Sequence, residues 1–149
     1  MIRLLQPWFA NVKKRLVKSP KVYIRDSGIF HALQGISTRD QLLTNPILGT
    51  SWEGFSLEEV ISRLHKRSNE VFFYAAHSGV EVDLFFKHKG KNIGIEFKYK
   101  DAPRTTKSMH QAIEDLELDH LYVIYPGTEP YDLTIKIKVI PLTHFDQHI

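Results

Sequence analysis

The chain has 149 residues, no cysteine and a formal net charge of +3, which suits one domain of ordinary size. The absence of cysteine excludes disulfides and every zinc or redox site built on thiolates, and it agrees with a reducing compartment. No apolar run reaches the ~18 residues of a membrane span and no secretory signal is visible, so we expect a cytoplasmic protein without a membrane partner.

The first part of the chain is strongly basic. Residues 1–25 contain seven lysines and arginines and no acid, so this segment carries +7 and the remainder carries −4. A basic stretch attracts phosphates. We therefore expect nucleic-acid contact, with DNA before RNA, through Lys13, Lys14, Arg15, Lys18 and Lys21. The alternatives are a solvated segment and a segment that faces another domain.

Residues 1–20 show no clear amphipathic periodicity, yet they contain too many apolar side chains for a free tail. They are expected to pack either on this domain or on a partner. We treat them as a basic N-terminal segment, or as the remnant of a link to a missing part, and we treat residues 21–149 as the domain itself.

Short elements are expected at the start of that domain. Residues 21–25 have the pattern of a short strand. Asp26 is placed to cap a short helix over residues 29–34. Thr38 with Gln41 fits a capping box, which predicts another short helix.

A longer helix is expected from Pro46 to about residue 66, because an asparagine followed by proline is typical of a helix start. Its apolar stripe is formed by Leu57, Val60, Ile61 and Leu64. Glu53 lies four residues before Leu57, on the same stripe. A carboxylate on a core-facing stripe either has a partner or costs stability. Alternatively, Glu53 is an ordinary acidic residue in the first turns of the helix, where the helix dipole stabilises a negative charge.

A β-hairpin is predicted over residues 79–100, after a strand over residues 71–76. Apolar and polar side chains alternate along both arms with period two. Lys89 and Gly90 are the expected turn, since glycine readily takes the positive φ that a two-residue turn requires.

The turn fixes the pairing register of the hairpin. A two-residue loop pairs residue 82 with residue 97, so apolar residues meet on one face. The same register sets Asp83 opposite Glu96, with Lys98 on that face. The hairpin is therefore expected to have one apolar face and one face on which two acids and a lysine gather.

Asp83, Glu96 and Lys98 form a pattern with chemical meaning. Neighbouring carboxylates repel each other unless a cation lies between them, and Mg²⁺ or Mn²⁺ suits hard oxygen ligands. An aspartate followed after twelve residues by Glu-x-Lys resembles the motif of the PD-(D/E)xK nuclease superfamily. The resemblance implies metal-dependent hydrolysis of phosphodiesters. Many enzymes of that superfamily supply a further acid from the first core helix, which favours Glu53 as a third ligand. The plain alternative is the solvated charged face of an ordinary hairpin.

The second half of the chain completes an α-β-β-β-α-β order. A helix is expected over residues 105–118, with Gln111 placed to support the site, and a strand over residues 120–125 should lie parallel to the second hairpin arm. This order resembles the core of the restriction-endonuclease-like fold, which implies an α/β class with a central mixed sheet flanked by helices. Residues 133–140 are expected to add an exposed edge strand that lysines protect.

Several short sequence segments together resemble one particular family, the C-terminal domain of unknown function of many prokaryotic AAA-type ATPases. They lie at residues 14–23, 26–29, 49–55, 81–83 and 95–98. The resemblance places Glu53, Asp83, Glu96 and Lys98 at nuclease-motif positions. Family members usually carry a preceding ATPase domain and this chain has none, so we expect a fragment or a truncated relative, with a separate ATPase as a partner and no ATP-dependent activity of its own.

Three functional hypotheses follow. In the first, Asp83 and Glu96 bind Mg²⁺ or Mn²⁺, and Glu53 is a further metal ligand or a positioning residue. Lys98 then orients the attacking water or stabilises developing charge. In the second, the chain is a nuclease-like module that binds nucleic acid or a protein partner without cutting. In the third, it forms a homodimer through residues 133–140.

Overall fold

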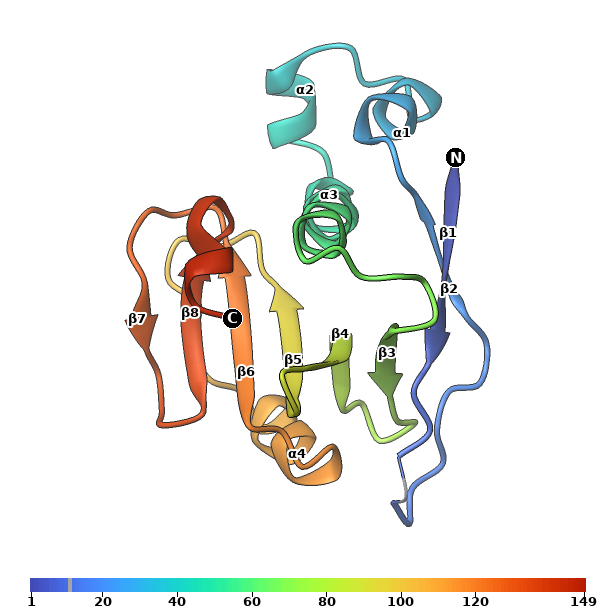
Figure 1. The fold of residues 1–149 in the computed structure, drawn as a ribbon. Helices are drawn as coiled ribbons and strands as arrows, with labels where there is room; N and C mark the ends of the chain where they lie inside the picture. Colours follow the sequence, from blue (N-terminus) through green and yellow to red (C-terminus); the bar gives the residue numbers. More distant parts are fainter. Residues whose placement is uncertain (11) are drawn as a thin grey trace.

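Residues 1–10 and 12–149, which the computed structural model describes, form one mixed sheet of eight strands flanked by helices (Figure 1). The strand order is β2-β1-β3-β4-β5-β6-β8-β7, so β2 and β7 are the two edges. The strands are β1 Ile2–Pro7, β2 Lys21–Ile24, β3 Val71–Ala75, β4 Glu81–His88, β5 Lys91–Phe97, β6 His120–Tyr125, β7 Tyr131–Asp132 and β8 Ile137–Pro141. The predicted α/β class with a central mixed sheet is confirmed.

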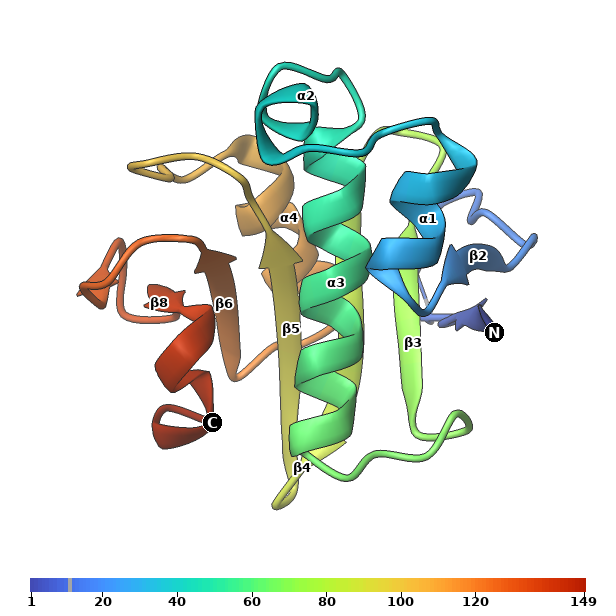
Figure 2. The ribbon, with the colours of Figure 1, turned by 90° about the horizontal axis from the view of Figure 1, so that it is seen from above.

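Helices cover both faces of the central strands. α3 (Leu48–Arg63) lies on one face and α4 (Lys107–Asp115) on the other (Figure 2). Two short helices, α1 (Ser27–Leu33) and α2 (Arg39–Leu43), leave all their side chains at least partly exposed, and the 3₁₀ helix η1 (Leu142–Gln147) follows β8. In chain order, α3, β3, β4, β5, α4 and β6 reproduce the predicted order of helix, three strands, helix and strand.

The predicted helix caps are largely confirmed. Asp26 caps α1, and Thr38 with Gln41 forms the capping box of α2. α3 starts at Leu48, two residues later than predicted, because the Asn45 side chain accepts a backbone N–H in the turn before the helix, 3.0 Å away. None of the helices in residues 1–10 and 12–149 is long and apolar enough to cross a membrane.

Two apolar layers hold the sheet between its helices. The layer under α3 includes Leu57, Val60, Leu84, Phe86, Ile95 and Phe97. The layer under α4 includes Val82, Phe85, Met109, Ala112, Leu121 and Val123. The predicted stripe of α3 is thus confirmed as a core-facing surface, and burial of these side chains is the main source of stability.

The turn of the hairpin follows the prediction. Lys89 and Gly90 have φ values of 49° and 78°, as a two-residue turn with two left-handed residues requires. Leu84 pairs with Ile95, and the pairing continues in the predicted register to the turn.

Beyond Leu84 the prediction of one continuous apolar face is wrong. Between Phe85 and Val82 the chain of β4 takes three steps while β3 takes two, which is a β-bulge. The bulge moves Val82 to the layer under α4, whereas Phe97 stays in the layer under α3. The alternation of β4 side chains between the two faces of the sheet is therefore interrupted at the bulge.

The N-terminal segment belongs to this sheet. Residues 2–7, for which no element was predicted, form β1, which pairs with β2 at four positions and with β3 at two. Arg3 is buried and binds Glu58 of α3, as does Arg25. Leu16 forms an isolated bridge with Ala76. Of the two alternatives for residues 1–20, packing on this domain is the one that the described part of the segment shows.

The C-terminal strand is shorter than predicted and is covered. β8 starts at Ile137 rather than at residue 133, because Thr134 Oγ1 accepts the backbone N–H groups of residues 136 and 137 and turns the chain there. β8 lies between β6 and β7, so residues 133–140 do not form a single exposed edge strand.

Gly94→Val is expected to destabilise the fold by about 1–3 kcal/mol, because overpacking a filled core costs that much. A Cβ at Gly94 would lie 2.8 Å from Leu118 Cδ1 and 2.9 Å from Leu121 Cδ1. The measurement is urea denaturation. Gly49→Ala in α3 is the control, since its Cβ would have no atom within 4 Å and alanine favours helix. Equal midpoints for both variants would contradict tight packing at Gly94.

Candidate active site

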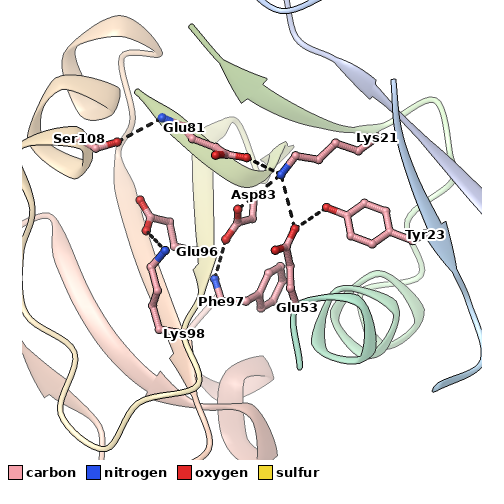
Figure 3. Close-up of polar contacts among 9 residues, drawn as sticks. All are labelled: Lys21, Tyr23, Glu53, Glu81, Asp83, Glu96, Phe97, Lys98 and Ser108. Atoms are coloured by element: carbon pink, nitrogen blue, oxygen red, sulfur yellow. Dashed lines mark hydrogen bonds and ion pairs between the residues drawn. The ribbon is translucent and has the colours of Figure 1, made fainter. Parts of the chain in front are cut away.

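Charged side chains gather at the open end of the hairpin, where β4 begins and β5 ends. Asp83 and Glu96 are 7% and 5% exposed, which is unusual for carboxylates. Figure 3 shows them beside α3 and β2, together with Glu53, Glu81, Lys21 and Lys98. Since ionised groups this deeply buried require partners, the contacts of each carboxylate define what the cluster can do.

Asp83 lies next to the β4 bulge and points toward α3. Its Oδ2 accepts the backbone N–H of Phe97 at 2.9 Å, and its Oδ1 lies 3.7 Å from Lys21 Nζ. Burial and the neighbouring Glu53 raise the pKa of Asp83 to about 7, against the opposing effects of Lys21, the Phe97 N–H and Lys98. Asp83 can therefore change its protonation state near neutral pH.

Glu96 and Lys98 form a pair on the neighbouring strand end. Lys98 Nζ lies 3.0 Å from Glu96 Oε2, and the lysine side chain is 44% exposed. Burial raises the pKa of Glu96, although Lys98 partly offsets that effect. Burial alone would lower the pKa of Lys98, but Glu96 and Asp83 raise it. Lys98 thus remains a cation with access to solvent.

Glu53 reaches the cluster from α3, as its place on the core-facing stripe predicted. The hydroxyl of Tyr23, on β2, donates to Glu53 Oε1 at 2.6 Å. Burial and Glu53 together raise the pKa of Tyr23 well above its usual value, so the phenol keeps its proton and stays a donor. Glu53 is held in place by a neighbour that the sequence analysis did not single out.

Lys21 lies among three of these carboxylates. Its Nζ is 2.5 Å from Glu81 Oε1, 3.5 Å from Glu53 Oε1 and 3.7 Å from Asp83 Oδ1. It also lies 5.4 Å from the ring centroid of Phe73, on which a cation packs favourably. Burial works against its charge, but Asp83 and Glu81 raise the pKa of Lys21 above its usual value.

Two further members of the cluster each share a strand face with a residue that the sequence analysis singled out. Glu81 precedes Asp83 by two residues in a predicted strand, and Tyr23 follows Lys21 by two in another. Period-two spacing marks such pairs as neighbours on one face. No pattern in the sequence indicated that β2 would lie close enough to the hairpin to bring the two pairs together.

Other predicted site residues lie elsewhere. Lys14 Nζ is 2.7 Å from both oxygens of Asp115 on α4, and Gln111 donates to Asp115 and Glu114 rather than to the carboxylates around Lys21. Burial opposes the charge of Asp115, but Lys14, Tyr74 and Gln111 hold its pKa below the usual value. The remaining predicted nucleic-acid contacts, Lys13, Arg15 and Lys18, are exposed.

The carboxylates suit a hard divalent cation by chemistry but are not arranged as a finished site. Within residues 1–10 and 12–149, no three His, Cys, Asp or Glu residues stand close enough to hold a metal ion. Mg²⁺ needs oxygens at about 2.0–2.1 Å. Here the oxygens of Glu53 and Asp83 are spaced around an ammonium group instead. Asp83 and Glu96 are the best candidates for metal ligands, with Glu53 as a third.

Asp83→Asn is expected to stabilise the protein in EDTA, and by more at pH 8 than at pH 5. Folded Asp83 keeps its proton up to about pH 7, whereas the unfolded chain releases that proton near pH ~4. The unfolded state binds fewer protons in this window, so unfolding free energy falls as pH rises. Asparagine does not titrate, so it removes this fall in unfolding free energy, and its side-chain oxygen still accepts the Phe97 N–H.

The expected gain in unfolding free energy at pH 8 is about 1–3 kcal/mol, from urea denaturation. Asp146→Asn, on the exposed surface of η1, is the control and should show no such pH dependence. An equal effect of Asp83→Asn at both pH values would mean that Asp83 titrates normally.

Comparisons with known proteins place the chain in a family. The family model described as domain of unknown function DUF4143 matches residues 48–145, and a second model, domain of unknown function DUF8612, matches residues 1–40. The uncharacterized proteins Rv2008c of Mycobacterium tuberculosis and Mb2031c of Mycobacterium bovis are each 40% identical to this chain over 141 residues.

That identity covers 95% of this chain but 32% of each relative, so the chain spans about a third of the length of the curated relatives that it matches. No solved structure matches the chain. The residues from α3 to β8, which include Glu53, Asp83, Glu96 and Lys98, lie within the matched range. The chain belongs to the DUF4143 family.

Proposed function

We propose that this domain is a metal-dependent nuclease of the PD-(D/E)xK type, with a restriction-endonuclease-like core formed by α3, β3, β4, β5, α4 and β6. One observation carries the proposal. A buried aspartate at a strand bulge lies beside a Glu-x-Lys pair on the adjacent strand end, and an acid from the first core helix points to the same place.

Each residue has a role in this proposal. Asp83 and Glu96 would hold Mg²⁺ or Mn²⁺, and Glu53 would complete or position the ligand set. When bound, such an ion polarises a phosphate and lowers the pKa of its water. Lys98, charged and 44% exposed, is placed to orient the water or to stabilise negative charge that develops on the phosphate.

The surroundings of the cluster support a phosphodiester substrate. A groove of about 440 Å³ lies beside it, lined by Val17, Ser19, Lys21 and Glu81 among others. The exposed Lys18 belongs to the same stretch of chain, and Lys13 and Arg15 precede it. A phosphate backbone is attracted to such a segment, which favours nucleic acid, and DNA in the first instance, as the partner.

A second function, a nuclease-like module that binds without cutting, is favoured by one specific observation. Lys21 and Lys98 already form ion pairs with the carboxylates, so the cluster can serve as a structural network without a metal ion. In that case the domain would act together with a separate domain or protein. We propose an AAA-type ATPase as that partner. Cytoplasmic location and homodimer formation also remain proposals.

The first test is cleavage of plasmid DNA and of single- and double-stranded oligonucleotides in Mg²⁺ or Mn²⁺. The parent is expected to cut and to stop in EDTA. Asp83→Asn, Glu96→Gln and Lys98→Met should each lower the rate by at least about 10²-fold, since each removes a group that acts on the reacting phosphate. Circular dichroism should show an unchanged fold.

The matched controls are Lys91→Met, at the turn end of the hairpin, and Asp146→Asn on η1, both exposed and neither a member of the cluster. They should cut like the parent. If all three site variants cut as fast as the controls, the mechanism is wrong. If the parent binds DNA but none of the proteins cuts any substrate, the binding module is the better description.

A further inference from the structure

The position of Lys21 is the feature that the proposed nuclease mechanism does not use. Three carboxylates from two elements, α3 and β4, approach one ammonium group that a third element, β2, supplies (Figure 3). Lys21 Nζ lies 2.5 Å from an oxygen of Glu81, 3.5 Å from one of Glu53 and 3.7 Å from one of Asp83. Two of these acids, Glu53 and Asp83, are also proposed metal ligands.

An ammonium group and a divalent ion make incompatible demands on the same oxygens. Metal–oxygen distances are about 2.0–2.6 Å, so ligands must approach more closely than Glu53 and Asp83 approach Lys21. Two like charges within such a small space repel strongly because buried groups are poorly screened. The carboxylates can therefore surround Lys21 or the metal, but not both at once.

We infer that Lys21 is a tethered cation that competes with the divalent metal for Glu53 and Asp83, so that metal enters only when the Lys21 ammonium leaves. The inference rests on the proposed function, because it concerns the same carboxylates. It assigns Lys21 a role as a positioning residue that sets metal affinity. The closely spaced ligands of a finished metal site are then expected only after Lys21 has moved.

A route for that movement is present. The Lys21 side chain is 26% exposed, and it borders the groove that Val17, Ser19 and Pro20 also line. Lysine has a flexible four-carbon stem, so the ammonium can rotate from the carboxylates toward this groove without moving β2. In the groove it would face solvent and the phosphates of a bound nucleic acid.

The test measures Mn²⁺ binding to the purified chain by titration calorimetry and by electron paramagnetic resonance of free Mn²⁺. Lys21→Met should bind Mn²⁺ at least about tenfold more tightly than the parent, within the usual range of coupling between two sites. Lys21→Arg keeps the charge and should bind no more tightly than the parent. Adding Asp83→Asn to Lys21→Met should abolish the binding.

Lys91→Met is the matched control, because it removes one positive charge from an exposed lysine that belongs neither to the cluster nor to the basic segment. It should bind Mn²⁺ like the parent. If Lys21→Met binds Mn²⁺ no more tightly than Lys91→Met, the inference fails, while Asp83-dependent binding by the parent would leave the proposed function standing. If no protein in the series binds Mn²⁺, both fail.

A second measurement uses the parent alone and does not depend on the folding of Lys21→Met. Lysines are acetylated with and without Mn²⁺, and each site is quantified by mass spectrometry. Release of Lys21 predicts that Mn²⁺ raises its labelling relative to Lys18 and Lys91. Unchanged or lower labelling of Lys21 at saturating Mn²⁺ would overturn the inference.

Discussion

Burying the carboxylates of Asp83 and Glu96 at the end of the hairpin costs free energy that neighbouring groups must offset. The Phe97 N–H and Lys21 do this for Asp83, and Lys98 does it for Glu96. The compensation is incomplete, since both carboxyl groups keep raised pKa values. A structure built for stability alone would have placed apolar side chains here, so the retained cost is itself an argument for a role in chemistry or binding.

The bulge in β4 is the local irregularity that makes the cluster possible. A regular strand would place Asp83 on the face opposite Leu84, away from α3. The extra residue changes this direction, so that Asp83 faces Glu53 and β2 while Leu84 keeps its place in the layer under α3. The bulge thus joins an acid from the hairpin to an acid from the helix, and bulges are common next to functional sites for this reason.

Local chemistry made much of the fold predictable. Capping residues, the Lys89–Gly90 turn and the apolar stripe of α3 each depend on neighbours within a few residues, and the structure agrees with them. The bulge was missed because nothing in the residues around Asp83 distinguishes an interrupted strand from a regular one. β1 was missed because its pairing with β3 joins residues more than sixty positions apart. The same long-range pairing brings Lys21 and Tyr23 into the cluster, so their roles could not be predicted from spacing.

The edge of the sheet that carries Lys21 and Tyr23 joins the core strands through β1 and the segment that follows it. β1 meets β3 at two residue pairs, and Trp8, Arg15 and Val17 add three backbone bonds to residues 73–77, whereas β1 and β2 pair with each other at four. Segments with few buried contacts open locally, in cooperative units, far more often than the whole domain unfolds. The β1–β2 hairpin, anchored to α3 through Glu58, has the form of such a unit. Its transient opening would remove one cation and one hydrogen-bond donor from the cluster while α3, β4 and β5 stay folded. The charge balance around Asp83 is then governed by the stability of an edge hairpin rather than by that of the core.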